Sequence, residues 1–155
     1  MSEHKQHHYH VTCRWNGSTG VGYEAYGRAH ELSATPAEAK LRTSSDPTFR
    51  GDPKLLNPEQ LLVMAASSCQ LLSFLAVAAR KRIDVVDYVD QAEGFMPEDD
   101  KPMRITRILL KPRIVVKGGD VATVKKAVEI SHEQCFIANS LKTEIEVQPE
   151  IIIQS

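Results

Sequence analysis

The sequence has little of what marks several large classes of protein. Neither charge is in excess, since Lys and Arg number 19 and Asp and Glu 20, so a basic field that attracts nucleic acid or an anionic membrane is missing. Aromatic residues make up only 6%, and neither a CxxC nor an HExxH motif occurs. We therefore expect no nucleic-acid partner and no membrane partner.

The N-terminal residues lack the apolar stretch of a secretory signal, so we expect a cytoplasmic protein. They include a histidine tract that could chelate a metal, although a closed metal site needs further supporting ligands. A solvated tail over residues 1–8 is therefore the favoured interpretation. The length of 155 residues suits one hydrophobic core, which predicts a single domain over 1–155. The N-terminal histidine tract named above consists of His4, His7, His8 and His10.

Cysteine is also scarce, because the chain holds three, at Cys13, Cys69 and Cys135. An odd number without an export signal argues against a secreted disulfide scaffold. A free cysteine in a reducing compartment is most often a small buried apolar residue. Sequence spacing alone therefore leaves open whether these residues are part of the core or part of a reactive site.

The clearest predicted element is a helix from Pro58 to about Lys81. Asn57 is a suitable N-cap, and proline is favoured at the first helical position. The helix is apolar on nearly all sides, but serines, a cysteine and a glutamine interrupt its longest apolar run. This pattern predicts a central helix or a subunit interface rather than a membrane span.

The rest of the chain alternates in the manner of β-strands, with two further helical segments. Asp120 is a predicted N-cap for a helix to about His132, and a short helix or turn follows over 135–141. Pro112 indicates an edge or a bulge in the strand that contains it. The order of elements predicts the α+β class with mainly antiparallel sheets. The predicted strands cover 9–15, 21–26, 30–32, 41–44, 85–94, 104–116 and 144–153.

Cys69 lies in the middle of the predicted helix, where the helix dipole has little effect on a thiol. A reactive thiolate there would need a nearby cation. Glu59 lies ten residues earlier, which is about 15 Å along the helix axis, so only bending or a second subunit would bring it near. Otherwise Glu59 simply stabilises the helix N-terminus. Cys135 could trap an oxidised Cys69 as a disulfide if the two face each other; otherwise both are core residues.

Two cysteine motifs in the same order carry a family resemblance. The run NPEQLL at 57–62, followed by SSC at 67–69, resembles the osmotically inducible protein C (OsmC) family and its organic hydroperoxide resistance (Ohr) branch. The run HEQCFIANS at 132–140 is similar to the second cysteine segment of that family. The runs RITRI at 104–108 and TEIEV at 143–147 are also similar, so the resemblance spans nearly the whole chain.

The resemblance implies an OsmC-like fold, with sheets packed on a long central helix in an intertwined homodimer. It implies that Cys69 is the peroxidatic cysteine, Cys135 the resolving cysteine and Glu59 the active-site glutamate. The family also places an arginine near the reactive thiol. Arg50 is the first candidate for that arginine and Arg28 the second, although each could instead be a solvated surface cation.

The function implied by the resemblance is that of a thiol-dependent peroxidase acting on organic hydroperoxides. A dithiol reductant, of the lipoyl type, would reopen the disulfide, and no metal, flavin or haem cofactor is expected because sulfur carries the chemistry. Two departures leave the substrate open: Phe136 replaces a common proline, and Gln70 a common aromatic residue or histidine. The alternative is a non-enzymatic dimer that binds an apolar small ligand at the subunit interface.

Overall fold

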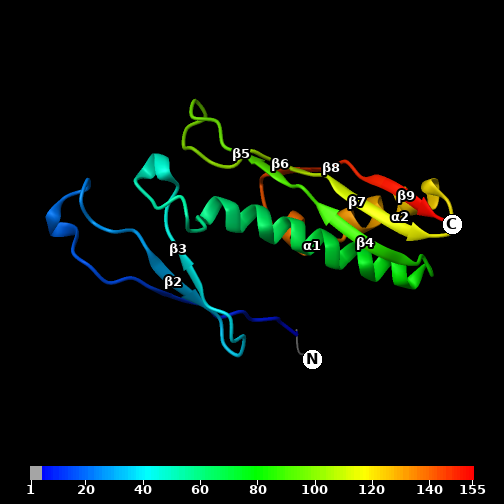
Figure 1. Ribbon diagram of the computed structural model, residues 1–155, viewed down its shortest axis with the longest axis horizontal. Coiled ribbons are helices and arrows are strands. Elements are labelled where there is room, and N and C mark those ends of the chain that lie inside the picture. Colours follow the sequence, from blue (N-terminus) through cyan, green and yellow to red (C-terminus); the bar gives the residue numbers. More distant parts are fainter. Residues whose placement is uncertain (1–4) are drawn as a thin grey trace. The chain divides into compact units, whose positions relative to one another are not determined.

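The computed structural model describes residues 5–155, and the chain divides into two compact units (Figure 1). Unit 1 extends to Pro58, and unit 2 covers Glu59–Ser155. The single domain over 1–155 stays a prediction. Within the predicted tail, residues 5–8 are exposed and lack regular secondary structure, whereas residues 1–4, including His4, lie outside the described residues.

Unit 1 contains one antiparallel sheet of three short strands in the order β1-β2-β3. The predicted strands at 9–15, 30–32 and 41–44 are confirmed with shifted ends, but the predicted strand at 21–26 is wrong. The chain turns there because Gly22 adopts φ 95° and the Arg28 guanidinium draws in nearby carbonyl oxygens. The elements of unit 1 are β1 (Thr12–Arg14), η1 (Thr19–Val21), β2 (His30–Ser33), β3 (Leu41–Thr43) and η2 (Pro47–Phe49).

Unit 2 contains two three-stranded sheets, in the orders β4-β7-β9 and β5-β6-β8. The three long strands predicted at 85–94, 104–116 and 144–153 are each broken in the middle, so that their halves belong to different sheets. Pairs β4–β7 and β5–β6 are antiparallel, whereas β6–β8 and β7–β9 are parallel. The strands are β4 (Val85–Asp90), β5 (Glu93–Phe95), β6 (Arg107–Leu110), β7 (Pro112–Lys117), β8 (Glu144–Val147) and β9 (Glu150–Gln154).

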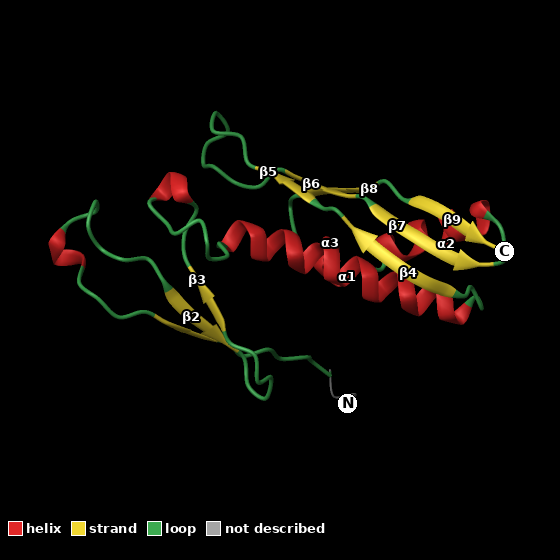
Figure 2. Cartoon of the chain, viewed as in Figure 1, coloured by secondary structure: helices red, strands yellow, loops and turns green. Residues whose placement is uncertain are grey.

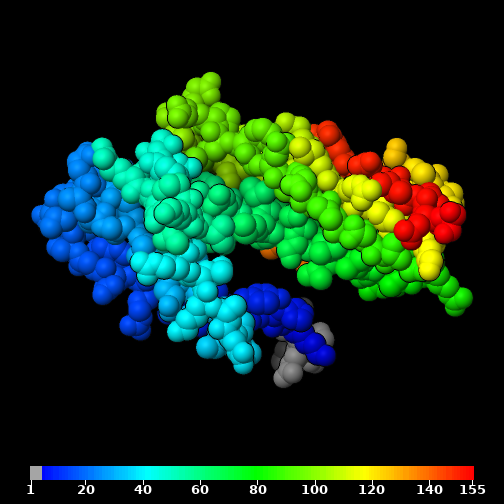
Figure 3. Space-filling view, viewed as in Figure 1, coloured from blue at the N-terminus to red at the C-terminus, as the bar shows by residue number. Residues whose placement is uncertain are grey.

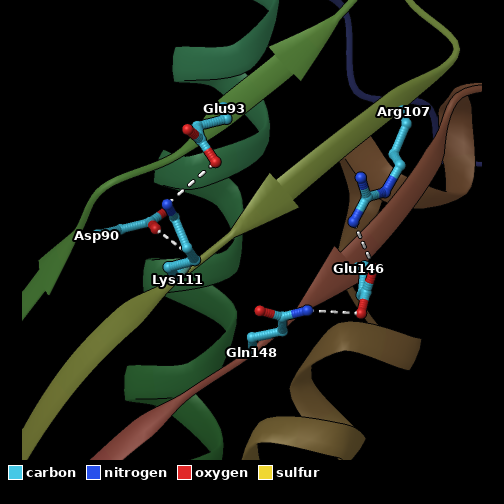
Figure 4. Close-up of polar contacts among 6 residues, drawn as sticks. All are labelled: Asp90, Glu93, Arg107, Lys111, Glu146 and Gln148. Carbon is cyan, nitrogen blue, oxygen red and sulfur yellow. Dashed lines mark hydrogen bonds and ion pairs between the residues drawn. The ribbon is translucent and has the colours of Figure 1, made fainter.

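At the break in the strand predicted at 104–116, a side-chain carboxylate replaces the backbone carbonyl as hydrogen-bond acceptor. Lys111 lies between β6 and β7, and its backbone N–H donates to Oδ1 of Asp90 over 2.7 Å (Figure 4). Pro112 has no N–H to give to a ladder and begins β7. Of the edge or bulge predicted at Pro112, the edge is wrong, because β7 is the central strand of its sheet; the irregularity is a break in the strand at Lys111.

All three predicted helices are present, as α1 (Pro58–Arg80), α2 (Val121–Glu133) and α3 (Phe136–Ser140) (Figure 2). Asp120 caps α2, because its carboxylate accepts a hydrogen bond from the Thr123 N–H over 2.9 Å. This hydrogen bond holds the pKa of Asp120 below its usual range. With four of the six strand pairs antiparallel among the described residues, the α+β class with mainly antiparallel sheets is confirmed.

The core of unit 2 lies where α1, α2 and the central strand β7 meet. Phe74 of α1 is fully buried there with Ile114 and Val116 of β7. By length and composition alone α1 could cross a membrane, but its place in this cluster is that of a core helix. Atoms of α1 also lie at the surface in Figure 3, and Met64, Leu72 and Leu75 are exposed. The remaining cluster members are Val77, Ala78, Val124, Ala127 and Val128.

Candidate functional site

Cys69 lies in the middle of α1 and is half-buried. Its sulfur accepts a hydrogen bond from the backbone N–H of Ile137, in the first turn of α3, over 3.5 Å. The thiol therefore faces the segment that begins at Cys135, as the family resemblance requires.

Cys135 is the N-cap residue of α3, and it is only 2% exposed. Burial raises the pKa of its thiol, and a side-chain hydrogen bond with Cys69 raises it further against the opposing effect of nearby backbone amides. A raised pKa favours the protonated thiol at Cys135, and both cysteines are free thiols.

Two hydrogen bonds from α1 fix the end of α2 just before Cys135. Nε2 of Gln70 donates to Oγ of Ser131 over 2.9 Å, and Oγ of Ser73 donates to the Ser131 carbonyl over 2.7 Å. Both Gln70 and Ser131 are buried, where such hydrogen bonds are costly to lose. This network sets the distance between the helix that carries Cys69 and the turn that carries Cys135.

Asp90 fixes the other side of α1 to the sheets. Its Oδ2 accepts a hydrogen bond from Oγ of Ser67 over 2.5 Å, while Oδ1 accepts the Lys111 N–H. The Lys111 ammonium forms an ion pair with Glu93 over 3.0 Å, as Figure 4 shows. Because Ser67 is two residues before Cys69, these contacts also fix the position of the thiol along the sheet.

Glu59 lies in the first turn of the same helix and is half-buried. Since α1 is continuous from Pro58 to Arg80, Glu59 and Cys69 are separated by about 15 Å along its axis. The two side chains therefore do not meet within one chain. A role for Glu59 beside Cys69 stays a prediction, and its place in the first turn of α1 also fits the alternative that it stabilises the helix N-terminus.

The candidate arginines belong to unit 1, and each has partners there. Arg50 is exposed and forms an ion pair with Glu24. The Arg28 guanidinium donates to the carbonyl oxygens of Tyr23 and Tyr26, each over 2.6 Å, and lies 3.8 Å from the Tyr26 ring centroid. The Arg28 guanidinium thus makes these contacts with its own loop, whereas Arg50 pairs with the exposed side chain of Glu24. An approach of either arginine to Cys69 stays a prediction.

Sequence reasoning missed the residues that hold the two thiols in place. Gln70, Ser73 and Ser131 lie in segments that the hydrophobic pattern describes only as helix. The alternating pattern predicts only a strand at Tyr88 and Asp90, although their spacing places both on the same face of β4. Their position on one face of β4 is the sequence feature that could have identified these residues, because it places a phenol and a carboxylate next to α1.

A separate groove of about 420 Å³ lies between α2, strand β8 and Pro149, which follows β8. Its polar lining includes Lys125, Glu129, His132 and Glu144. Glu146, also in the lining, accepts hydrogen bonds from Gln148 and Arg107, which hold its pKa below the usual range (Figure 4). Within residues 5–155, no group of three or more His, Cys, Asp and Glu side chains is placed to hold a metal ion.

Comparison with known proteins identifies similar chains. The family model for OsmC-like proteins matches residues 51–150. The uncharacterized protein YmaD of Bacillus subtilis (strain 168) is 22% identical over 153 residues, which cover 96% of this chain and 95% of YmaD.

Solved structures also match over almost their full length. An OsmC-like protein of unknown function from Vibrio cholerae superimposes with a TM-score of 0.83 at 28% identity, covering 93% of this chain and 99% of that one. An organic hydroperoxide resistance protein OsmC from Legionella pneumophila has a TM-score of 0.66 at 18% identity, with 95% and 99% covered. The second likeness concerns the fold alone.

Proposed function

Because this chain belongs to the OsmC-like protein family, we propose that it is a thiol-dependent peroxidase that reduces organic hydroperoxides. The observation that carries the proposal is that the two thiols lie near each other in different environments. The Cys69 sulfur accepts a hydrogen bond from the Ile137 amide, while burial and the nearby Cys69 thiol raise the pKa of Cys135, so that Cys135 retains its proton. An acceptor sulfur suits the attacking thiolate, and a protonated neighbour suits the resolving thiol.

The proposed cycle has three steps. The Cys69 thiolate attacks the outer peroxide oxygen, the O–O bond breaks, and the alkoxide takes a proton and leaves as an alcohol. The Cys135 sulfur then attacks the Cys69 sulfenic acid, and the Cys135 proton leaves with the hydroxyl group as water. A dithiol reductant, of the lipoyl type, reduces the disulfide, and its two hydrogens restore both thiols. The cycle needs no cofactor.

An organic substrate is supported by the surface beside the thiols. Phe136, which follows Cys135, is 82% exposed, and an exposed aromatic ring favours contact with an apolar peroxide substituent. A non-enzymatic dimer that holds an apolar ligand would use the same surface. Only the peroxidase requires the contact between the two sulfurs.

The first experiment measures consumption of cumene hydroperoxide with excess dithiothreitol. We expect Cys69→Ser to consume peroxide no faster than dithiothreitol alone. Cys13→Ser is the matched control, because Cys13 is an exposed thiol of unit 1, and it should retain the wild-type rate. If wild type and Cys69→Ser consume peroxide equally slowly, the ligand-binding alternative is favoured instead.

A second measurement tests the proposed disulfide directly. After one equivalent of peroxide, non-reducing peptide mass spectrometry should find a Cys69–Cys135 linked peptide that has lost two hydrogens. Cys135→Ser should instead hold Cys69 as a sulfenic acid after one equivalent, and a second equivalent should convert it to a sulfinic acid. A lasting sulfinic Cys69 in the wild-type protein would contradict resolution by Cys135.

The role of an arginine is also proposed. We place Arg50 beside the reactive thiol, where its charge would stabilise the thiolate and Glu59 would hold it by hydrogen bonds. Arg50→Ala should then reduce the peroxide rate by about 100-fold, the scale expected for losing one oriented charge or donor. Arg28→Ala is the comparison: a larger loss there than in Arg50→Ala would transfer the role to Arg28.

We further propose that the protein is a cytoplasmic homodimer with its active sites at the subunit interface. Leu72 is 63% exposed, and Met64 and Leu75 of the same helix are also exposed, which favours a second copy as the cover of these apolar side chains. Leu72→Glu should shift the sedimentation equilibrium towards the monomer and slow peroxide consumption. Val121→Glu is the control, since Val121 is 43% exposed at the start of α2, and it should remain dimeric.

A further inference from the structure

Gln70 follows Cys69 on α1 and is only 1% exposed, so its amide group is buried beside the candidate site. Its Nε2 donates to Oγ of Ser131 over 2.9 Å, but its Oε1 is buried without a hydrogen-bond partner among the described residues. A buried acceptor without a partner lowers stability, and a leucine would fill a similar volume without one. The amide therefore contributes more to the position of Ser131 than to stability.

Ser131, the residue that Gln70 binds, lies near the end of α2 and four residues before Cys135. Backbone hydrogen bonds hold the short segment between Ser131 and Cys135. The N–H of Gln134 donates to a carbonyl in the last turn of α2 over 3.2 Å, and the Cys135 N–H donates to the His132 carbonyl over 3.2 Å. A side-chain contact at Ser131 is therefore transmitted to the Cys135 backbone through a hydrogen-bonded turn.

The contacts with this segment come from the part of α1 that carries the reactive thiol. Ser73 lies four residues after Cys69, and hence on the same face, and its Oγ donates to the Ser131 carbonyl over 2.7 Å. The Cys69 sulfur accepts the N–H of Ile137, two residues after Cys135, over 3.5 Å. Residues 69, 70 and 73 of α1 therefore hold the chain on both sides of Cys135.

We propose that Gln70 is a positioning residue, whose hydrogen bond to Ser131 holds the Cys135 thiol within reach of Cys69 for disulfide closure. The inference rests on the proposed peroxidase cycle, in which the Cys69–Cys135 bond must form and break in each turnover. The two sulfurs must meet in a narrow geometry for that bond to form. Holding the dithiol protein near that geometry lowers the conformational entropy that is lost on closure.

The test measures disulfide closure without peroxide, in a Cys13→Ser chain whose only remaining cysteines are Cys69 and Cys135. Buffers with defined ratios of oxidised and reduced dithiothreitol supply the oxidant, because the cyclic disulfide takes two hydrogens from the protein and becomes the dithiol. Alkylation followed by mass spectrometry gives the fraction of closed protein and hence the equilibrium constant for closure. We expect Gln70→Leu to lower this constant about fivefold, the scale of one lost neutral hydrogen bond.

Urea unfolding of the dithiol protein separates the effect on position from an effect on stability. Gln70→Leu removes the unpaired Oε1 together with the donor, and Oγ of Ser131 still donates to the Val128 carbonyl over 2.8 Å. The urea midpoint should therefore stay near its wild-type value. Asp120→Ala is the matched control, because it removes the N-cap at the other end of α2. It should lower the urea midpoint and leave the closure constant unchanged.

Ser131→Ala removes the same hydrogen bond from the side of α2, and it leaves the backbone carbonyl at position 131 to accept from Ser73. Alone it should lower the closure constant as Gln70→Leu does. The double variant should lower the constant no further, because a single hydrogen bond can be lost only once.

A wild-type closure constant in Gln70→Leu overturns the proposal, and so do an equal loss in Asp120→Ala or additive losses in the double variant. A wild-type protein that forms no Cys69–Cys135 disulfide in these buffers overturns it as well. Failure of the peroxidase cycle would appear separately, as a wild-type protein that closes the disulfide in dithiothreitol buffers but does not consume hydroperoxide.

Discussion

Units 1 and 2 are stabilised by different kinds of interaction. In unit 2, apolar side chains from two helices and the central strand β7 are buried together. In the described part of unit 1, the buried residues are Thr43, Ser44 and Asn57, all of them polar. A segment that buries no apolar side chain gains little to offset the conformational entropy lost on folding. The comparison therefore indicates that unit 1, taken by itself, gains less stability from apolar burial than unit 2.

Side-chain hydrogen bonds take the place of a hydrophobic core in unit 1. Nδ1 of His30 lies 2.8 Å from the Arg28 carbonyl, which can only accept, so Nδ1 carries the proton. In the neutral ring, Nε2 then accepts from the Thr43 hydroxyl over 2.8 Å, and Oγ of Ser44 accepts the Asp52 N–H over 3.1 Å. Such contacts specify a geometry but contribute less stability than an apolar core.

The two units should differ most in how much the free energy of unfolding falls when an apolar side chain is truncated. Phe74→Ala in unit 2 should lower the free energy of unfolding by about 3–5 kcal/mol, because it leaves a cavity in a fully buried cluster. Leu41→Ala in unit 1, at a side chain 42% exposed, should cost less than about 0.5 kcal/mol. Urea unfolding measures both, and similar losses would contradict the comparison.

Removing a polar contact of unit 2 should have a smaller effect. Asp90→Ala leaves the Ser67 hydroxyl and the Lys111 N–H without their acceptor, which should cost about 1–3 kcal/mol in urea unfolding. Asp87→Ala is the control, since Asp87 lies on the same strand and is exposed. Equal stability of the two variants would show that Asp90 does not hold α1 to the sheets.

Alkaline pH should destabilise unit 2 through Tyr88 and Cys135. Both have a raised pKa in the folded protein, so the unfolded chain releases these protons first, near the usual values of about 10 and 8.5. Their contribution to stability is therefore complete below those values and is lost as the pH rises above them. Urea unfolding between about pH 8 and 11 should show this loss as a decrease in the free energy of unfolding. The decrease should be smaller in Tyr88→Phe than in Tyr23→Phe, which changes an exposed tyrosine of unit 1.

The smallest effect should come from the exposed ion pair of unit 1. Arg50 and Glu24 are both largely exposed, so a double-mutant cycle on their alanine variants should give a coupling energy below about 1 kcal/mol. A much larger value would mean that unit 1 gains real stability from surface charge. Arg50→Ala should thus impair peroxide consumption without unfolding the protein, which separates its proposed role from stability.

Local sequence patterns were sufficient to predict most elements. Pro58, Asp120 and the apolar periodicity of α1 and α2 gave both long helices close to their observed ends, because caps and helical faces are local properties. The breaks in the three long strands were not predictable in this way. The strand break at Lys111 depends on the Asp90 carboxylate, which lies 21 residues away in sequence.

The two cysteines show the same division between local and tertiary information. The sequence by itself determined the family, the α+β class and the identity of Cys69 and Cys135 as the residues to examine, because these follow from ordered motifs and local periodicity. Only the tertiary structure decided that the Cys69 sulfur accepts a hydrogen bond from the Ile137 amide and that the Cys135 thiol is buried with a raised pKa. The direction of a hydrogen bond and the burial of a thiol depend on groups that distant segments bring together, and sequence spacing does not encode them.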